Sequence, residues 1–202
     1  MLDSWVIPKL ATPLTQLAKR LEKRGIRPDQ VSLAGFALGM LAVPALALEG
    51  YWVALMLVVV NRLCDGLDGA LARIVGPTDR GGYLDITLDF IFYASVVFGF
   101  ALADPAANAL AAAALITSFM GTGASFLAFA IMAQKREIKN IRLPNKGLYY
   151  INGLAEGTET IAFLVAFCLF PTYFPSLAYV FCAICITTTV TRVYGGYTTL
   201  KD

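Results

Sequence analysis

The stretch DGLDGALAR occupies residues 65–73, and the stretch GGYLDITLD occupies residues 81–89. Both lie among apolar residues that are typical of hydrophobic helices, and together they contain four aspartates. An ionised carboxylate at membrane depth is costly unless it is paired, hydrated or bound to a cation, so it marks a candidate functional site. The four residues are Asp65, Asp68, Asp85 and Asp89.

The spacing of these aspartates predicts one shared pocket. The first two are three residues apart and the last two are four apart, so each pair lies on one face of an α-helix. We expect a loop of about eight residues to make the two helices antiparallel and to bring the pairs together. Clustered carboxylates repel one another unless divalent cations neutralise them. Because the ligands are oxygens and the chain has no histidine, the expected ion is Mg²⁺, Mn²⁺ or Ca²⁺ rather than Zn²⁺. Small neighbours predict room for a sizeable ligand, and these are Gly66, Gly69, Ala70 and Ala72.

The composition indicates an integral membrane protein. Of the 202 residues, 58% are hydrophobic and 15% are charged, and the mean hydropathy is +0.68. A soluble domain is ordinarily less apolar. The net charge of +2 does not favour a nucleic-acid partner, and we expect none. Four cysteines fall in apolar segments and are interpreted as core residues, and these are Cys64, Cys168, Cys182 and Cys185.

Six apolar stretches match the roughly 20 residues needed to cross a bilayer. The expected spans are 29–48, 51–73, 81–103, 106–134, 148–170 and 173–198. The predicted fold is therefore all-α, a polytopic membrane protein with six transmembrane helices. Residues 1–28 form a juxtamembrane segment and residues 29–202 form the membrane domain.

An amphipathic helix is expected to precede the first span. Thr12 and Pro13 match an N-cap and a first helical position, and Gly25 matches a helix end. One face is apolar and the opposite face is basic, as in helices that lie on a membrane surface. The apolar face holds Leu14, Leu17, Ala18 and Leu21, and the basic face holds Lys19, Arg20, Lys23 and Arg24. The alternative is a solvated linker with incidental periodicity.

Basic residues distinguish the two sides of the membrane. Connections 49–50, 104–105 and 171–175 contain no lysine or arginine, whereas the other connections are rich in them. The positive-inside rule therefore places both termini and the loop after Arg73 in the cytoplasm, with the protein in the cytoplasmic (inner) membrane. At 1.5 Å per residue, the acids lie about one to two turns beneath the cytoplasmic surface. Arg62 is the one basic residue inside a span and away from a loop.

Eight residues of the two acidic stretches stand at the fixed spacing of a known signature: Asp65, Asp68, Gly69, Ala72, Arg73, Gly81, Asp85 and Asp89. The pattern closely resembles the signature of the CDP-alcohol phosphatidyltransferase family, integral membrane enzymes of phospholipid synthesis. Family members often carry Asn and Thr where this chain has Asp29 and Ser32. The resemblance implies transfer of a phosphatidyl group from a CDP-linked lipid, expected to be CDP-diacylglycerol, to an alcohol, with release of CMP.

The resemblance also implies roles for the signature residues. Two divalent ions are expected, held mainly by Asp65, Asp68 and Asp85, and Asp89 is the expected catalytic base with a possible share in metal ligation. CDP binding is assigned to Asp65, Gly69, Ala72, Arg73 and Gly81, with Gly81 also forming the turn into the next helix. Arg73 has an alternative role as a simple interfacial anchor.

The acceptor alcohol is less clearly indicated. A basic patch could bind a phosphorylated acceptor such as glycerol 3-phosphate, with phosphatidylglycerophosphate as the favoured product, or an inositol phosphate. Its members are Arg136, Arg142, Lys146 and Arg192. Membrane topology and anionic headgroups explain most of the same charges. Glu156 and Glu159, in the fifth span, could contact the acceptor or pair with Arg62 or Arg192.

Other functions remain open on sequence alone. A magnesium-dependent membrane prenyltransferase also uses paired acids, although its acidic motifs are typically far apart. A divalent cation transporter could use buried carboxylates, although it does not explain the glycine, alanine and arginine that follow Asp68. The small residues at 121–125 favour close helix packing, and a homodimer is expected.

Overall fold

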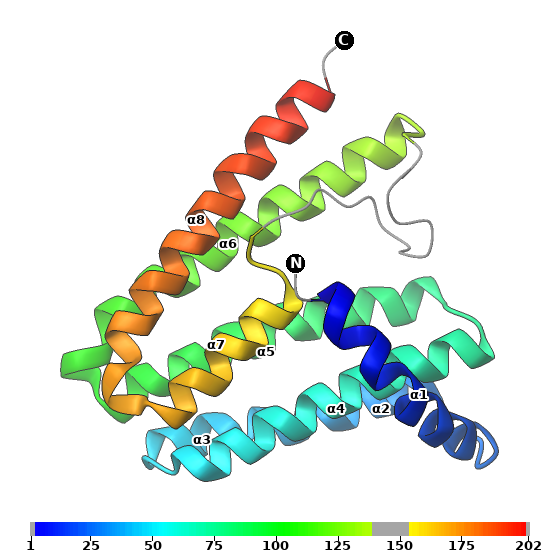
Figure 1. Ribbon diagram of the computed structural model, residues 1–202, viewed down its shortest axis with the longest axis horizontal. Coiled ribbons are helices and arrows are strands. Elements are labelled where there is room, and N and C mark those ends of the chain that lie inside the picture. The colour runs from blue at the N-terminus through cyan, green and yellow to red at the C-terminus, as the bar shows by residue number, and fades with distance from the viewer. Residues whose placement is uncertain (1–2, 139–153, 201–202) are drawn as a thin grey trace.

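The computed structural model describes residues 3–138 and 154–200, and the elements within these ranges are helical. Figure 1 shows the α-helices, coloured in chain order. One short 3-10 helix, η1, lies between α7 and α8. Their bounds are α1 Asp3–Glu22, α2 Pro28–Met40, α3 Ala42–Ala47, α4 Tyr51–Val75, α5 Asp79–Ala103, α6 Pro105–Lys135, α7 Gly157–Leu169, η1 Pro171–Tyr173 and α8 Phe174–Thr199.

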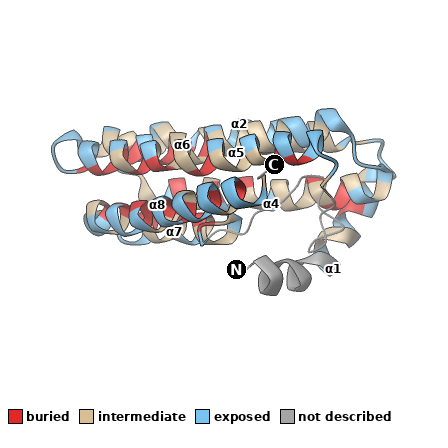
Figure 2. Cartoon of the chain, turned by 90° about the horizontal axis from the view of Figure 1, so that it is seen from above, coloured by how far each residue is buried: buried red, intermediate tan, exposed pale blue. Residues whose placement is uncertain are grey.

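The helices form two layers. One layer contains α2, α5 and α6 and the other contains α4, α7 and α8, with buried residues concentrated where the layers meet (Figure 2). Aromatic rings fill this interior. The rings of Phe100 and Phe174 stack with centroids 4.6 Å apart, and those of Phe163 and Phe181 stack at 4.3 Å. The long helices α6 and α8 pack against each other and extend beyond the rest of the bundle (Figure 1).

Four helical segments are long and apolar enough to cross a membrane, and they are Pro28–Ala47, Asp79–Ala103, Pro105–Lys135 and Pro171–Thr199. The six predicted spans are therefore confirmed in part. Helix α4 has 25 residues but carries two aspartates and two arginines, and α7 has 13 residues. The predicted start of the fifth span, residue 148, lies outside the described residues. The second and fifth spans stay predictions.

The first apolar segment is interrupted between α2 and α3, at Leu41. Pro44 follows three residues later. A proline has no N–H to donate, and its ring crowds the carbonyl one turn earlier, so an α-helix bends or breaks at this distance. The predicted single helix over 29–48 is therefore two helices that continue in one membrane-length segment.

The N-terminal helix differs from its prediction in where it begins. Helix α1 starts at Asp3 and continues through Thr12 and Pro13, although it contains two prolines, Pro8 and Pro13. A proline inside a helix removes one hydrogen bond and can kink the helix without ending it. The end of α1 is as predicted, since Gly25 adopts φ +73° just beyond it. Part of its apolar face packs on α4 rather than on lipid, because Ala18 is fully buried with Leu71.

The connection between α4 and α5 is shorter than expected. It comprises residues 76–78 rather than about eight residues, because each helix extends beyond its predicted end. Gly76 makes the turn at φ +102°. Thr78 then caps α5 by accepting a hydrogen bond from the Gly81 amide at 3.1 Å. The prediction that Gly81 forms the turn was wrong, since Gly81 lies inside the first turn of α5.

Candidate active site

Helix α2 lies unusually close to α4 and α5 because of two glycines spaced four apart. A Cβ atom on Gly35 would overlap the Cys64 side chain, and one on Gly39 would come within 2.8 Å of Asn61 and Phe92. Small residues at this spacing let helix backbones approach closely. The close approach brings Ser32 of α2 to the aspartates of α4, and the Ser32 hydroxyl donates a hydrogen bond to Asp68 Oδ2.

Three of the four aspartates converge as predicted. One carboxylate oxygen from each of Asp65, Asp68 and Asp85 lies within 4.8 Å of the others. Asp68 is the most enclosed, with 6% of its surface exposed, whereas Asp85 is exposed. We call these three residues the carboxylate triad. Its members come from α4 and α5, so the two acidic motifs do meet in one pocket.

The carboxylate triad fits a hard divalent cation. It offers three anionic oxygens, the ligand type that Mg²⁺, Mn²⁺ and Ca²⁺ prefer. The cavity among these residues has a volume of about 20 Å³, and its walls include Ser32, Asn61 and Asp89. A space of this size holds roughly one water-sized guest.

Asp89 is held differently from the carboxylate triad. Its Oδ1 accepts a hydrogen bond from Arg62 Nη2 at 2.7 Å, and its Oδ2 accepts one from the Tyr93 hydroxyl at 2.9 Å. Arg62 also lies 3.6 Å from Asp65 Oδ2. The buried arginine therefore pairs with two aspartates of the site. Glu156 immediately precedes α7 and Glu159 lies in its first turn, and their place in the fifth span stays a prediction.

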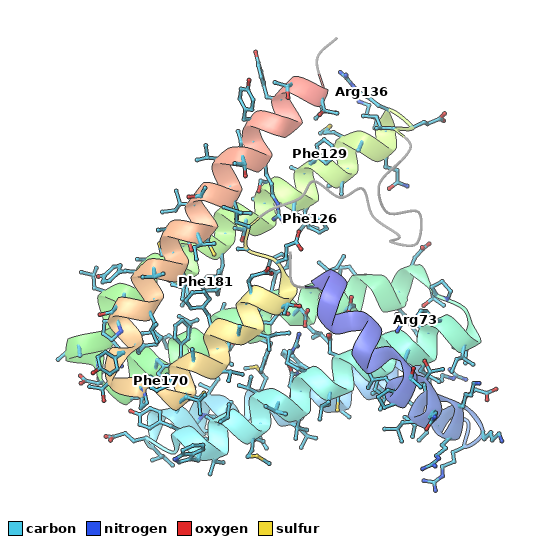
Figure 3. The ribbon with its side chains drawn as sticks, in the orientation of Figure 1. Arg73, Phe126, Phe129, Arg136, Phe170 and Phe181 are labelled. Carbon is cyan, nitrogen blue, oxygen red and sulfur yellow. The ribbon has the colours of Figure 1, made fainter. Side chains whose placement is uncertain are left out.

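The residues expected to bind CDP lie along α4 and at the start of α5. A Cβ atom on Gly69 would meet only the Arg73 side chain at 3.6 Å, an ordinary contact, so packing within the described chain does not require a glycine there. Arg73 is exposed near the end of α4, beside α1 (Figure 3). Gly66 and Ala70 instead allow α1 to pack on α4, because a Cβ on Gly66 would lie 3.0 Å from Leu14 and Ala70 is buried beside Ala18.

A groove opens beside the first turns of α2 and α5. It has a volume of about 350 Å³, and an ion pair between Arg80 and Asp29 crosses it. Gly81 approaches this pair, since a Cβ added to it would lie 3.5 Å from Asp29 Oδ1. The lining residues are Arg27, Asp29, Gln30, Leu33, Arg80 and Leu84.

Of the residues expected to bind the acceptor, the two that the structure describes, Arg136 and Arg192, lie apart from each other. Arg192 is buried between α8 and α6, where its Nη1 donates to the Thr122 carbonyl at 3.2 Å and its guanidinium lies 5.6 Å from the centre of the Phe126 ring. Arg136 is exposed at the distal end of α6 (Figure 3). Arg142 and Lys146 lie outside the described residues.

The small residues of α6 serve packing within the chain. A Cβ atom on Gly121 would lie 3.0 Å from Thr189 of α8, and one on Gly123 would lie 2.9 Å from the Phe90 ring of α5. Both distances are tighter than ordinary contacts. The predicted role of this stretch in helix packing is confirmed, and the homodimer stays a prediction.

Sequence reasoning missed two polar residues of the site, Asn61 and Tyr93, and it named Ser32 as a family position without assigning it a contact. Tyr93 follows Asp89 by one helical turn, so its position on the same face was readable from the spacing. Gly35 and Gly39 were a readable signal that α2 packs tightly. Asn61 gave no signal beyond its place beside Arg62.

Comparison with known proteins gives related sequences and folds. A protein 54% identical over 202 residues, covering 100% of this chain and 98% of the relative, is the inner membrane protein YnjF of Escherichia coli. The archaetidylinositol phosphate synthase of Pyrococcus horikoshii is 39% identical over 100 residues, which are 49% of this chain and 53% of that protein.

Solved structures share the fold. The phosphatidylinositol phosphate synthase PgsA1 of Mycobacterium tuberculosis, solved with CDP-DAG bound, gives a TM-score of 0.69 at 21% identity and covers 92% of this chain and 94% of that one. A second structure of PgsA1, with manganese and citrate, gives a TM-score of 0.67 at 22% identity and covers 92% of this chain and 89% of that one.

The sequence model of one family matches residues 26–191, which include α2 to α7 and most of α8. The match contains both acidic motifs and the groove beside them. The chain therefore belongs to the CDP-alcohol phosphatidyltransferase family.

Proposed function

We propose that this protein transfers the phosphatidyl group of a CDP-linked lipid to an alcohol and releases CMP. The observation that carries the proposal is the convergence of the carboxylate triad beside Asp89 in apolar helices. The relatives support it, because two PgsA1 structures with this fold contain CDP-DAG in one case and manganese in the other. CDP-diacylglycerol is the proposed donor.

Asp65, Asp68 and Asp85 would hold the divalent metal, Mg²⁺ or Mn²⁺. Bound there, the metal would neutralise charge on the pyrophosphate and on the departing CMP. The Ser32 hydroxyl fixes Asp68, so its carboxylate is already oriented. A second ion, with Asp89 as a shared ligand, stays a prediction from the family resemblance.

The cytidine nucleotide is proposed to lie along the α4 backbone and in the groove between α2 and α5. Gly69 and Ala72 leave that stretch of backbone accessible, and Arg73 is free to reach a phosphate because it is exposed. The lipid tails would leave the site sideways into the bilayer. Both termini and the opening of the site are proposed to face the cytoplasm, in the cytoplasmic membrane.

Asp89 is the proposed catalytic base. The attacking alcohol must lose a proton, and a carboxylate is the available acceptor in a chain without histidine. Asp89→Asn keeps the shape of the side chain but cannot take the proton, so turnover should fall about a hundredfold or more while the KM for the CDP-lipid changes little. An equal loss of donor binding and turnover would instead indicate a ligand role.

The proposed acceptor is a phosphorylated polyol. Arg192 is joined to the site through α6, because it binds the Thr122 carbonyl and the next residue, Gly123, packs on the Phe90 ring beside Asp89. The name of the P. horikoshii relative favours an inositol phosphate over glycerol 3-phosphate. Arg136, Arg142 and Lys146 would add long-range attraction for such an anion.

The test is CMP release by the full chain in lipid nanodiscs. CDP-diacylglycerol and Mn²⁺ or Mg²⁺ are supplied with inositol phosphate, glycerol 3-phosphate, serine, inositol or phosphatidylglycerol, each alone. One acceptor should drive metal-dependent CMP release. Cytidine nucleotide binding without release for any acceptor would leave the donor site standing and remove the acceptor assignment. CMP release also separates this reaction from prenyl transfer and from cation transport.

A further inference from the structure

Arg62 is a buried cation inside the candidate site. Its side chain is 10% exposed, and its guanidinium carbon lies 5.0 Å from the ring centres of both Phe92 and Tyr93. The guanidinium donates hydrogen bonds to Asp89 Oδ1 and to the Tyr93 hydroxyl, both at 2.7 Å. The guanidinium group is therefore held both by contacts with the aromatic rings and by hydrogen bonds from its N–H groups.

The same guanidinium is anchored to a third helix. Its Nε and Nη2 donate to Asn61 Oδ1 at 2.8 and 2.5 Å, and Asn61 Nδ2 donates to the Gly35 carbonyl of α2 at 3.0 Å. Asn61 is buried, so this chain of hydrogen bonds is shielded from water. Arg62 is therefore positioned by α2, α4 and α5 together, and it transmits that position to Asp89.

The charge of Arg62 opposes the loading of a metal. It lies 3.6 Å from Asp65, a member of the carboxylate triad, and a positive charge at this range repels a divalent cation. A neutral residue would leave the triad with a higher cation affinity. The site thus contains a group that weakens metal binding, and its hydrogen bond to Asp89 indicates that it serves to position that carboxylate.

We propose that Arg62 is a positioning residue which, with Tyr93, holds the Asp89 carboxylate apart from the carboxylate triad and directed to the proton of the acceptor, while lowering the affinity of the triad for metal. This inference rests on the proposed function, in which Asp89 is the base. Arg62 and Tyr93 together occupy one position on each carboxylate oxygen of Asp89, and the remaining lone pairs stay available for a proton.

The experiment measures two quantities on the same full-length protein in nanodiscs, Mn²⁺ affinity without substrate and the rate of CMP release. Arg62→Gln removes the positive charge and the contact with Asp89. We expect Mn²⁺ to bind about tenfold tighter or more, because a repulsive charge is gone. The kcat should fall about a hundredfold, because Asp89 is released. A purely structural role would lower both quantities together.

Two further variants separate charge from positioning. Tyr93→Phe leaves the charge unchanged, so Mn²⁺ affinity should stay within about twofold while kcat falls about tenfold and the KM for the CDP-lipid does not change. Arg62→Lys keeps the charge with fewer donors, so it should keep near-normal Mn²⁺ affinity and a kcat above that of Arg62→Gln. Arg24→Gln, which removes an exposed charge just beyond α1, is the matched control and should leave Mn²⁺ affinity within about twofold.

Different results would overturn the role of Arg62 and the proposed phosphatidyl transfer. If folded Arg62→Gln binds Mn²⁺ no tighter than the unaltered protein, the inference is overturned even where CMP release is normal in that protein. If Arg62→Gln does not fold, a Tyr93→Phe variant with unchanged kcat, or an Arg62→Lys variant with a lost Mn²⁺ affinity, overturns it. An unaltered protein that binds no Mn²⁺ and releases no CMP overturns the proposed function itself.

Discussion

Polar side chains are satisfied in opposite ways at the two ends of the bundle. In α6 and α8 the hydroxyl groups bond to carbonyls three or four residues earlier on their own helix, and they belong to Thr117, Ser118, Thr122, Ser125, Thr187, Thr188, Thr189 and Thr191. Around α2, α4 and α5 several polar side chains also bond between helices, as Ser32 does to Asp68 and Arg62 does to Asp89, although Ser32 and Tyr93 each make a further bond within their own helix.

This difference in hydrogen bonding distinguishes the helices that mainly support the fold from those that form the site. A hydroxyl that returns to its own helix satisfies its polarity locally and makes few demands on its neighbours. Polar groups that depend on a partner helix fix the position of both, which is what a site must do to orient a substrate. The α6 and α8 pair has a few longer-range bonds as well: Arg192 donates across to the Thr122 carbonyl, Cys182 to the Ala114 carbonyl, and Thr188 also accepts from the Leu154 and Ala155 amides. Arg192 is the charged member of this set. Substitutions in the two regions should therefore differ in their effect on turnover.

The largest effect is expected from the carboxylate triad. Asp68→Asn should reduce CMP release by at least about a thousandfold and remove Mn²⁺ binding, because a neutral amide is a poor ligand for a hard cation. Calorimetry with Mn²⁺ and the CMP assay measure the two losses. Asp104→Asn is the control, since Asp104 caps α6 through the Ala107 amide at 3.0 Å and an asparagine caps equally well. Normal turnover in Asp68→Asn would remove Asp68 from the ligand set.

Ser32→Ala should have the next largest effect. It deletes a hydrogen bond to a buried carboxylate, a contact of about 1.5–3 kcal/mol, so turnover should fall about tenfold to a hundredfold. Ser32→Thr keeps the hydroxyl and should retain most of the activity. Steady-state kinetics on both variants decide the point. Equal losses in the two variants would indicate that packing of α2 matters and the hydroxyl does not.

Arg192→Gln tests the charged side chain that crosses from α8 to α6. If Arg192 binds an anionic acceptor, the KM for that acceptor should rise about tenfold with little change in the KM for the CDP-lipid. Thr191→Val is the neighbouring control, because Thr191 is exposed and bonds within α8. A fall in stability with unchanged KM values would place Arg192 among the structural residues.

The smallest effect is expected from a hydroxyl that bonds to its own helix. Thr117 is exposed and donates to the Ala113 carbonyl at 2.8 Å. Thr117→Val should change the free energy of unfolding by no more than about 0.5 kcal/mol and leave turnover unchanged. Unfolding in detergent followed by circular dichroism measures the first quantity. A large loss of turnover would show that the division of the bundle into two kinds of region is wrong.

Long apolar runs made much of the fold predictable. The predicted spans 81–103, 106–134 and 173–198 match α5, α6 and α8 within a few residues, because an uninterrupted apolar stretch has few alternatives to a helix. Helix ends were less predictable. The α4 to α5 connection is shorter than expected because α4 continues past Arg73 through Ile74 and Val75, and α5 begins two residues early, at the polar Asp79 and Arg80, where hydropathy gives no signal.

Part of the site could be predicted because the spacing of the aspartates along the sequence shows which of them share a helix face. The carboxylate triad follows from three acids on two neighbouring helices, and the structure brings them together. The roles of Ser32 and Asn61 depend on how closely α2 approaches, and that distance is set by contacts between segments far apart in the sequence. Such tertiary contacts are not encoded in any local period.

Analysis of the lipid product tests the central claim most directly. The full chain in nanodiscs, given CDP-diacylglycerol, Mn²⁺ and inositol phosphate or glycerol 3-phosphate, should convert the donor into one new phospholipid whose mass includes the acceptor, with one CMP released per lipid formed. The Asp85→Asn variant should form neither product. If the unaltered protein binds Mn²⁺ and CDP-diacylglycerol but yields no new lipid and no CMP with any acceptor supplied, the account of this site as a phosphatidyl transfer centre is contradicted.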